Sequence, residues 1–530
     1  MTTPWIEVLR NATVGAFQGP NGDYPSVLDV LDGLTAVQAS WKQSLYRHSI
    51  WQIVDHLAKS KEWERRVILG ERPPAPTWED PGGDDAAWLA AIVRLRGAQG
   101  QLLETIDRLA EDELWKRPPT QTGWPVVNLV LNKAAHDAYH AGQIRHLRAL
   151  QENLNDEMVT RLVRQRAMPT GPIEATVRAV RREHFLPGVA LEAVYSGEAV
   201  ITRRGPEGIP ISSSSMPEIM ALMLQQLDVQ PGHRVLEVGA GTGYNAALLG
   251  VLAGPAGDVT TVDIDAAIVQ EARQRLDASG HPVVRTVTAD GWLGVPEYAP
   301  FDRIEVTVGV SDLSPAWVTQ LKDGGRLVVP LWLARGQEVA VAFHNRAGCL
   351  RSVAVILCGF MRLRGPHAGP ETFVTVRDWF IPLEEPDPVR LAALETVLAC
   401  EPRVEPAPPG LQGWWARLLL EEPRAITLGR KGEWRKNGCG ILEVGERPGL
   451  AFVTARTWDH QLYTFGSDAA RAMLLERLVG IRPLDVRDLT IEAIAATAPQ
   501  PQDGMVLRRR NFQFVLRERG ATDRQGCFTI

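Results

Sequence analysis

The chain has 530 residues, a formal net charge of -6 at pH 7 and 45% hydrophobic residues. A net negative charge argues against nucleic acid as a partner, because contacts to phosphate need a basic face. The sequence shows no secretory signal at Met1, no run long enough to span a membrane and only five scattered cysteines, which together predict a cytoplasmic protein of about three domains.

The first block of the chain, residues 1–155, predicts an all-α four-helix bundle. Ser49 stands directly before one helical segment and is a predicted N-cap. Proline-rich loops separate the helical segments from one another. Apolar residues recur at helical spacing in residues 27–34, 50–57, 88–95 and 129–138.

The second block, residues 165–383, alternates strands with helices, which predicts a Rossmann-like α/β domain built on a parallel sheet. Two further apolar runs follow Pro330, and the turn at 344–348 between them predicts an antiparallel hairpin at the edge of the sheet. Parallel strands are expected at 234–238, 258–263, 283–289, 302–308 and 325–332, and hairpin strands at 339–343 and 352–357.

The third block, residues 390–530, predicts a small α+β domain with no chemistry visible in it. A helix is expected at 469–478, and strands at 440–444 and 512–516. Its tryptophans belong either to the core or to a groove that binds a peptide. The candidates for the groove are Trp414, Trp415 and Trp434.

A glycine-rich loop follows the first parallel strand and is the strongest signal in the chain. Gly239, Gly241 and Gly243 are spaced two apart, and Asp263 follows twenty residues later at the end of the next strand. This spacing predicts a βαβ unit that binds a nucleoside, with the acid holding the ribose hydroxyls. A dinucleotide site would have G-x-G-x-x-G and a pyrophosphate. Glu237 is expected to place a negative charge at the loop mouth, which favours the sulfonium of S-adenosylmethionine (SAM).

Three further features are predicted to complete a SAM site. Asp265 stands near the expected ribose edge, and Asp290-Gly291 ends the third strand, where a carboxylate faces the adenine amino group. The serine run 212–215 precedes a helix, and its hydroxyl and backbone N–H groups can hold a carboxylate. The alternative interpretation of this run is a flexible linker or a simple N-cap.

Residues 170–370 resemble the protein-L-isoaspartate O-methyltransferases, because several motifs of that family occur here in the same order. The resemblance implies transfer of a methyl group from SAM to a carboxylate oxygen of an isoaspartyl or aspartyl residue in a protein or peptide. The matching segments are Arg182 to Pro187, the serine run before Pro217, the glycine loop, Asp290-Gly291, Ala299 to Asp302 and Leu321 to Pro330.

The same resemblance assigns roles to the serines. It implies that Ser215 is the active-site serine, which orients the carboxylate without becoming a covalent nucleophile, and that Ser213 and Ser214 contact SAM and substrate. Two departures bear on the choice of substrate: Ser214 replaces an isoleucine, and residues 308–312 differ from the small-residue run of the family.

The first block carries a second candidate site. His136 and His140 are four residues apart, so they share one helix face, and His56 on another helix can complete a set of three. By spacing alone, such a pair is more often a surface coincidence. Residues 24–150 resemble the DinB family of four-helix metalloproteins, which implies a divalent metal, zinc or nickel, at these three histidines. His48 precedes the helix and is a weaker candidate.

The sequence leaves the function of the whole chain open between several readings. The end of the chain, residues 517–526, is similar to the FxLD-system methyltransferases, which implies modification of a ribosomally made precursor peptide as an alternative to general protein repair. A metal-dependent thiol transferase with a regulatory methyltransferase domain is the runner-up. A scaffold that holds SAM without turnover is the third reading, and the sequence does not indicate an oligomeric state.

Overall fold

The structure is a computed structural model, and the chain in it divides into two compact units. One unit comprises Met1–Arg164 with Arg181–Val200, and the other Gln165–Val180 with Ile201–Ile530. Within the described residues, no helix is both long enough and apolar enough to cross a membrane. The structure describes residues 4–19, 25–44, 47–118, 123–205, 210–385, 387–409, 411, 413–430, 433–455 and 459–519, with side chains left out at 433–436.

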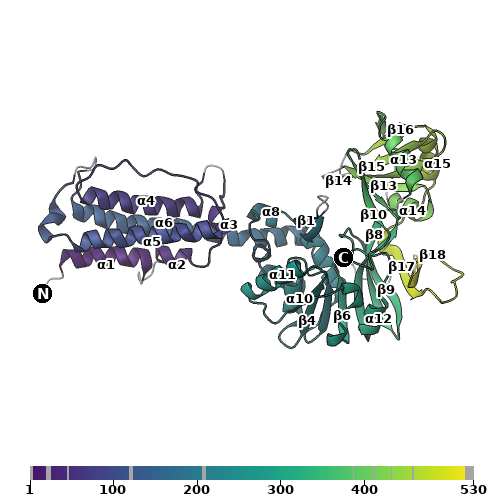
Figure 1. Cartoon of the computed structure of the whole chain (residues 1–530), viewed down its shortest axis with the longest axis horizontal. Helices are drawn as coiled ribbons and strands as arrows, with labels where there is room; N and C mark the ends of the chain where they lie inside the picture. The colour runs from purple at the N-terminus through teal and green to yellow at the C-terminus, as the bar shows by residue number, and fades with distance from the viewer. Residues whose placement is uncertain are drawn as a thin grey trace. The chain divides into compact units, whose positions relative to one another are not determined.

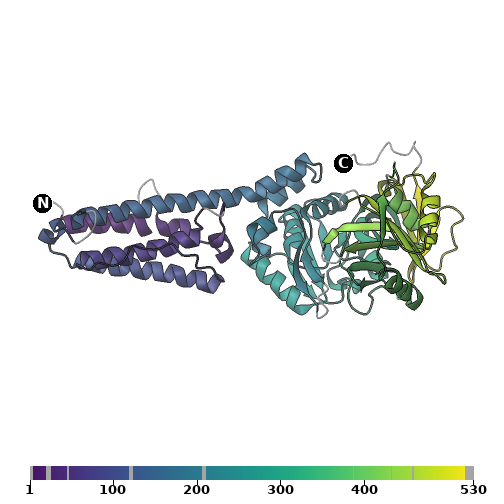
Figure 2. The same cartoon turned by 90° about the horizontal axis from the view of Figure 1, so that it is seen from above.

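Four long helices form the bundle of the first unit: α1 (Trp5–Gln18), α4 (Ile50–Ile68), α5 (Asp85–Asp107) and α6 (Val126–Arg164). They run side by side, with α1 and α4 each packed against α5 and α6 (Figures 1 and 2). Buried apolar side chains fill the space between them, as expected for helices with one apolar face. The shorter elements are α2 (Val27–Leu31), α3 (Ala36–Ser40) and the 3-10 helix η1 (Glu111–Trp115).

Three of the four predicted helical segments lie within α4, α5 and α6, and Ser49 caps α4 as predicted. Gln52 completes this cap, because its side chain accepts the Ser49 backbone N–H. The prediction for residues 27–34 was wrong in extent, since α2 ends at Leu31 and Gly33 follows it with a φ of 71°. The fourth long helix is α1, which the apolar spacing had not marked.

The helix α6 continues past the expected limit of the first block at residue 155 and ends at Arg164. Residues 181–200 return to the same unit through the 3-10 helix η2 (Arg182–Phe185) and α8 (Leu191–Val194), which packs on α6. Arg182 is fully buried and donates to the carbonyls of Val194 and Glu198, at 3.1 and 3.2 Å. The segment that carries the Arg182 to Pro187 signature therefore folds with the bundle unit.

A ten-stranded sheet forms the centre of the second unit, in the order β18-β19-β17-β9-β8-β7-β6-β3-β4-β5. The five strands from β7 to β5 in this order are parallel, and the others are antiparallel, so the predicted parallel core is confirmed. Their bounds are β3 (Arg234–Val238), β4 (Asp258–Asp263), β5 (Arg285–Thr288), β6 (Phe301–Val306), β7 (Leu321–Ala334), β8 (Gln337–Arg346), β9 (Cys349–Leu357), β17 (Leu489–Ala495), β18 (Met505–Arg508) and β19 (Phe512–Glu518).

Helices pack against this sheet on either side of the glycine loop. The helix α9 contacts β6, β7 and β8, whereas α10 and α11 contact the strands from β3 to β5, beside β4 in Figure 1. A small separate sheet pairs β1 (Val200–Arg204) with β2 (Pro210–Ser214). The helices are α7 (Pro172–Ala179), α9 (Pro217–Leu227), α10 (Tyr244–Ala253), α11 (Ala266–Ala278) and α12 (Pro315–Gln320), with 3-10 helices η3 (Gly291–Leu293), η4 (Pro296–Tyr298) and η5 (Val486–Asp488).

The hairpin of β8 and β9 forms as predicted, but it does not lie at the edge of the sheet. Strand β17 pairs with β9, and Ser352 Oγ accepts the Ile491 N–H at 2.8 Å. An open strand edge presents unpaired backbone groups, and here the C-terminal strands cover it. Residues 489–518, expected in the third domain, therefore belong to the ten-stranded sheet.

A second, seven-stranded antiparallel sheet has the order β10-β11-β13-β14-β15-β16-β12. It also takes in residues 372–383, which the sequence pattern assigned to the middle block. Helix α15 lies at 469–478 as predicted. The elements are β10 (Thr372–Val376), β11 (Trp379–Leu383), β12 (Arg403–Pro406), β13 (Ala425–Arg430), β14 (Glu433–Glu443), β15 (Gly449–Thr454), β16 (Gln461–Gly466), α13 (Pro388–Val397), α14 (Trp414–Glu421) and α15 (Ala469–Leu478).

Of the two alternatives for the tryptophans, the core is observed for Trp414, which is 3% exposed in the apolar core beneath α14, with Trp415 packed against that core. The side chain of Trp434 lies outside the described residues, as do residues 520–526 of the segment compared with the FxLD-system tails.

Candidate functional site

The glycine loop connects β3 to α10 in a conformation that only glycine adopts easily. Gly239, Gly241 and Gly243 have φ values of 107°, 49° and 85°. A Cβ atom on Gly239 would lie 2.5 Å from Thr307 Oγ1, and one on Gly243 would lie 3.3 Å from the Ala272 carbonyl oxygen. The loop is therefore a close-fitting backbone cradle at the carboxyl end of the parallel sheet, where open α/β sheets bind their ligands.

Glu237 does not lie at the mouth of this loop, so that prediction was wrong. Its side chain is 1% exposed and accepts hydrogen bonds from Asn245 Nδ2 at 2.8 Å and Thr261 Oγ1 at 2.5 Å. Asn245 Nδ2 also lies 2.8 Å from Oε2 of Glu305, which pairs with Glu237 across β3 and β6. Burial raises the pKa of Glu237 to about 8 and that of Glu305 to about 7. This cluster ties α10 to the sheet.

The two acids after β4 have different surroundings. Asp263 ends the strand, and its Oδ1 accepts the Asp265 N–H at 3.1 Å. Asp265 caps α11, since its carboxylate accepts the Ala267 N–H at 3.1 Å. Arg364 lies beside both, with nitrogen–oxygen distances of 3.6 Å to Asp263 and 3.7 Å to Asp265. Asp265 therefore shapes the turn that follows Asp263, and Arg364 lies beside both carboxylates.

Asp290 and Gly291 form the other side of the predicted adenosine site. Asp290 Oδ1 accepts the Trp292 N–H at 3.0 Å, and its Oδ2 lies 3.3 Å from His367 Nδ1. The His367 ring stacks on Trp292 with 5.5 Å between centroids. A Cβ on Gly291 would lie 2.5 Å from Val238 Cγ1, so a glycine is required for this strand end to approach β3.

Arg364 and His367 were missed by the sequence reasoning. Both belong to the segment that follows β9 and crosses to the acids at the ends of β4 and β5. Gly365 packs in the same place, since a Cβ on it would lie 2.6 Å from Ile264 Cδ1. These residues carry no motif and lie about 120 residues after the glycine loop. Only their contacts reveal them.

The serine run forms strand β2 and its exit, so neither the flexible linker nor the N-cap interpretation applies. The N-cap of α9 is Met216, which makes no side-chain cap. A Cβ on Gly241 would lie 3.4 Å from the Ser213 carbonyl oxygen, so the strand lies directly against the glycine loop. Ser214 is 3% exposed, and Ser215 lies between the end of β2 and the start of α9. The structure thus brings the serines to the predicted site.

The segment 308–312, where the sequence departs from the family pattern, anchors the C-terminal strands. Asp312 is buried, and its Oδ2 accepts the Asn511 backbone N–H at 2.7 Å and the Asn511 side-chain amide at 2.9 Å. Strand β19 begins at Phe512, one residue after Asn511. The departure of this segment from the family pattern therefore has a structural reason, because Asp312 holds the start of the added strand.

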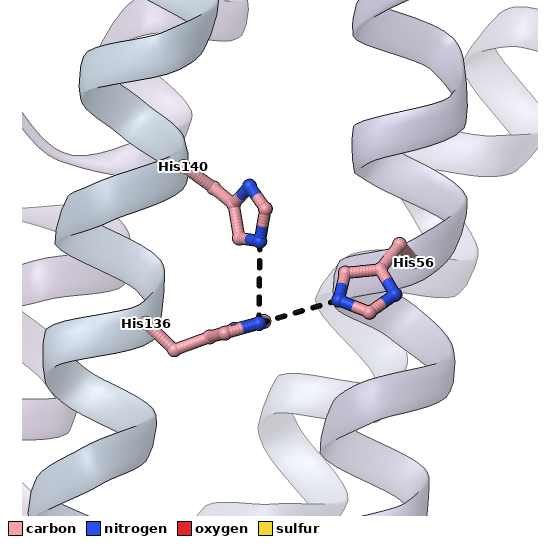
Figure 3. A group of neighbouring side chains, drawn as sticks. All are labelled: His56, His136 and His140. Carbon is pink, nitrogen blue, oxygen red and sulfur yellow. Dashed lines mark hydrogen bonds between the residues drawn. The ribbon is translucent and has the colours of Figure 1, made fainter. Parts of the chain in front are cut away.

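The three predicted metal-site histidines converge inside the bundle. His56 projects from α4, and His136 and His140 project from α6 (Figure 3). The Nε2 atom of His136 lies 3.2 Å from the Nε2 atoms of both other rings, and one ligand atom from each histidine lies within 4.8 Å of the others. Gln143 Oε1 holds Nδ1 of His140 at 2.7 Å. The i, i+4 spacing thus produces a cluster rather than a surface coincidence.

The electrostatics of this cluster suit a cation. Burial lowers the pKa of His56 to about 4 and that of His136 to about 3, so both rings are neutral, the state that ligates metal. Three nitrogens that face one point can share one N–H proton, or they can bind one ion. Among the described residues, Nδ1 of His56 and of His136 is buried without a hydrogen-bond partner. Three imidazoles form a donor set that fits zinc or nickel.

His48 is not part of this donor set. Its ring stacks on Trp78 at 3.7 Å between centroids, and Trp78 stacks in turn on His56 at 4.1 Å. Below the histidines, Lys61 and Asp137 form an ion pair at 2.5 Å with both side chains fully buried. Lys133, also buried, lies 3.6 Å from Glu64. The site therefore sits between a stacked indole and a layer of paired charges.

The Rossmann-like sheet, the glycine cradle and the acids at the ends of β4 and β5 define the second unit as a SAM-dependent methyltransferase. A family model described as Protein-L-isoaspartate(D-aspartate) O-methyltransferase matches residues 152–364, and one described as DinB superfamily matches residues 24–144. The methyltransferase match thus begins inside α6, in the same helix that carries two of the histidines.

The chain belongs to the protein-L-isoaspartate O-methyltransferase family. It is 35% identical over 216 residues to "Protein-L-isoaspartate O-methyltransferase 2" of Polaromonas sp. (strain JS666), which covers 39% of this chain and 98% of that one. The Methanopyrus kandleri relative is 33% identical over 217 residues, 41% of this chain and 93% of that one. A Thermotoga maritima relative is 40% identical over 153 residues, and the chain spans about half (48%) of its length.

Solved structures of the same family are also similar to this chain. One protein-L-isoaspartate O-methyltransferase has a TM-score of 0.39 and 23% identity, and covers 64% of this chain and 96% of that one. A Plasmodium falciparum chain solved with S-adenosyl-L-homocysteine has a TM-score of 0.34 and 18% identity, with 40% and 98% covered. The family match over residues 152–364 and the sequence relatives do not favour the thiol-transfer alternative for the whole chain.

Proposed function

We propose that the second unit transfers the methyl group of SAM to a carboxylate oxygen of an L-isoaspartyl or aspartyl residue in a peptide or protein. The observation that carries the proposal is the glycine cradle of Gly239 and Gly241, with the Ser213 strand packed against it. Membership of the isoaspartate methyltransferase family supports the same reaction.

The residues around the cradle suit SAM. In this proposal Asp263 accepts the ribose hydroxyls and Asp290 accepts a hydrogen bond from the adenine amino group, which the positions of Asp263 at the end of β4 and of Asp290 just past β5 support. Gly239, Gly241 and Gly243 let the loop backbone pack closely against its neighbours, and the methionine part of the ligand would bind along this backbone. SAM supplies a methyl group that its sulfonium already activates.

The protein then has little acid–base work to do, because an ionised carboxylate is already a competent nucleophile. Its main contribution is to hold the carboxylate in line with the methyl group, and such positioning can contribute about 7 kcal/mol or more. Ser215 leads from β2 into α9, beside the cradle, and orients the acceptor carboxylate by hydrogen bonding. No covalent intermediate on the serine is required.

The role of Ser215 can be tested with the full chain, labelled SAM and an isoaspartyl peptide. Ser215→Ala is expected to lower kcat roughly tenfold to a thousandfold, in the range found when one positioned donor is lost. Affinity for SAM is expected to stay within a few fold, which separates positioning from cofactor binding. A Ser215→Ala variant with full kcat would remove this serine from the mechanism.

We further propose that the bundle binds one zinc or nickel ion through His56, His136 and His140, with a coordination position left open. The support is the convergence of the Nε2 atoms of three imidazoles, with His136 Nε2 3.2 Å from both others. Metal content of the purified chain should be close to one ion and should be lost in His136→Ala, but kept in His48→Ala. Equal metal content in both variants would contradict this assignment.

The seven-stranded sheet and its helices are proposed to help recognise the peptide, in general repair or in modification of a precursor peptide. Methylation of many unrelated isoaspartyl peptides would favour repair. Methylation of one aspartyl sequence, with unrelated isoaspartyl peptides left unmodified, would favour dedicated peptide modification.

A further inference from the structure

Arg362 is a buried cation that the reaction proposed above does not use. Its guanidinium lies over the face of Trp332, with Cζ 3.8 Å from the ring centroid, and Phe373 lies further out at 6.0 Å. Stacking occupies the flat face of the guanidinium and leaves the N–H groups at its edge available. Trp332 belongs to β7 and Phe373 to β10, so both sheets of the second unit contribute to the site.

The donors of this site have no acceptor within the described part of the chain. Nε, Nη1 and Nη2 of Arg362 and Nε1 of Trp332 are all buried without a hydrogen-bond partner there. Glu338 Oε1, itself without a hydrogen-bond partner among the described residues, forms an ion pair with Nη1 at 3.6 Å, which leaves Nε, Nη2 and the indole N–H as the donors without an acceptor there. The other oxygen of Glu338 accepts the Phe360 N–H at 3.0 Å. Buried donors are rarely left unpaired, so their grouping here points to a missing acceptor.

Gly309 forms the floor beneath these charges. A Cβ on Gly309 would lie 2.2 Å from Glu338 Oε1 and 2.8 Å from Arg362 Nη1, so no side chain fits there. This glycine belongs to the segment 308–312, where the chain departs from its family. The lack of a side chain at Gly309 therefore leaves the space that the guanidinium fills.

The site lies next to the glycine cradle. Gly309 N donates to the Met361 carbonyl oxygen at 2.7 Å, and Thr307 N donates to the Val238 carbonyl oxygen at 2.9 Å. Residues two apart in an extended segment point their backbone groups to the same side. Residues 361–363 therefore run on the β3 side of this segment, above the strand that leads into the cradle.

We propose that Arg362, with Trp332 Nε1, binds a second carboxylate of the peptide substrate, separate from the carboxylate that is methylated. A guanidinium edge matches a carboxylate in a bidentate manner. The acceptor carboxylate belongs beside Ser215 and the cradle, whereas Arg362 is held over Gly309 by its packing on β7. The ligand class is thus an acidic peptide, and the second carboxylate is either a side chain near the acceptor or the C-terminus. This inference rests on the proposed function, because it presumes a peptide in the site.

The test uses the full chain and a panel of peptides with one isoaspartyl residue. In this panel one Asp is placed in turn at each of the three positions before and after the isoaspartyl residue. In a matched control peptide, Asn replaces that Asp. Each peptide is made with a free and with an amidated C-terminus. The wild type is expected to favour a carboxylate at one position by about tenfold in KM. Arg362→Gln should abolish that preference, with kcat and SAM affinity within about twofold. Arg351→Gln, which changes an exposed arginine on β9, should keep it.

A purely structural role for Arg362 predicts a different result. The pair Arg362→Met with Glu338→Met would then restore activity on every peptide, because the two charges are removed together. The proposal expects this double variant to fold and bind SAM, yet to treat the acidic and amide peptides alike. No preference in the wild type, or an equal loss on both peptides in Arg362→Gln, would overturn it.

Direct binding of the same peptides by fluorescence polarisation separates this inference from the proposed reaction. If no peptide is methylated but acidic peptides bind more tightly in an Arg362-dependent way, the proposed reaction fails and the carboxylate site stands. If peptides are methylated without any such preference, the reaction stands and the carboxylate site fails.

Discussion

The histidine cluster of the bundle and the nucleoside cradle of the methyltransferase are built in opposite ways. The cluster uses side chains from two rigid helices, and the spacing of His136 and His140 within one helix fixes most of its geometry. The cradle uses backbone at strand ends, and segments far apart in the sequence complete it. The difference shows which part of a site a sequence can encode locally, and it implies that each site can be removed without the other.

The largest expected effect comes from Gly241→Asp. The backbone there has a φ of 49°, and a Cβ would lie 3.4 Å from the Ser213 carbonyl oxygen, so a carboxylate at this place is strained and repelled. Binding of SAM, measured by calorimetry, should fall below detection. Metal content should match the wild type, and if it fell as well the two sites would not be independent.

The second prediction concerns the charges beneath the histidines. Lys61→Met leaves Asp137 buried without its partner, and breaking such a pair costs about 3–5 kcal/mol of unfolding free energy. Thermal unfolding followed in the full chain should show the bundle destabilised. The double change with Asp137→Leu should recover most of the loss. If Lys61→Met alone were as stable as the wild type, the ion pair would contribute nothing to the free energy of unfolding.

The third prediction concerns the acids beneath the cradle. Burial raises the folded-state pKa of Glu237 to about 8, above its usual value of 4.5, so the folded state binds the proton more tightly. The resulting stability is full below pH 4.5 and is lost as the pH rises through 8, by an amount on the order of a few kcal/mol.

Glu237→Gln keeps a neutral side chain at every pH and should flatten this dependence. Chemical unfolding of both proteins from pH 5 to pH 9 makes the comparison. If the free energy of unfolding changed with pH in the same way in both proteins, the titration of Glu237 would not be the cause of the pH dependence.

The smallest expected effect comes from Arg364. Its ion pairs with Asp263 and Asp265 are long and partly exposed, and such pairs contribute only about 0–1 kcal/mol. Arg364→Gln should therefore change SAM affinity by no more than about fivefold, towards tighter binding, since it frees the Asp263 carboxylate. A large loss of affinity would instead make Arg364 a direct cofactor ligand.

The sequence alone predicts the features that a single helix, strand or short loop determines. Ser49, the glycine loop and helix α15 all lie where their patterns predict, because caps, turns and periodicity are local. Glu237 was misplaced because β3 is buried on both faces, so the side chain that precedes the loop is buried as well. Arg362 was not found because its surroundings come from β7, β8 and β10.

The limits of the strands and domains were harder to predict, because contacts between segments far apart in the sequence decide them. Nothing local to residues 489–518 indicates that they pair with β9, since β-pairing depends on which edge is open. The unmarked helix α1 likewise owes its place to packing against α5 and α6.

The central claim is that the second unit methylates a peptide carboxylate without help from the histidine cluster. Incubation with methyl-labelled SAM, an isoaspartyl peptide and its aspartyl twin tests it directly in the wild type, Gly241→Asp and His136→Ala. The account predicts base-labile label in one of the two peptides, at equal rates for the wild type and His136→Ala, and none for Gly241→Asp. Label lost in His136→Ala but kept in Gly241→Asp would contradict it.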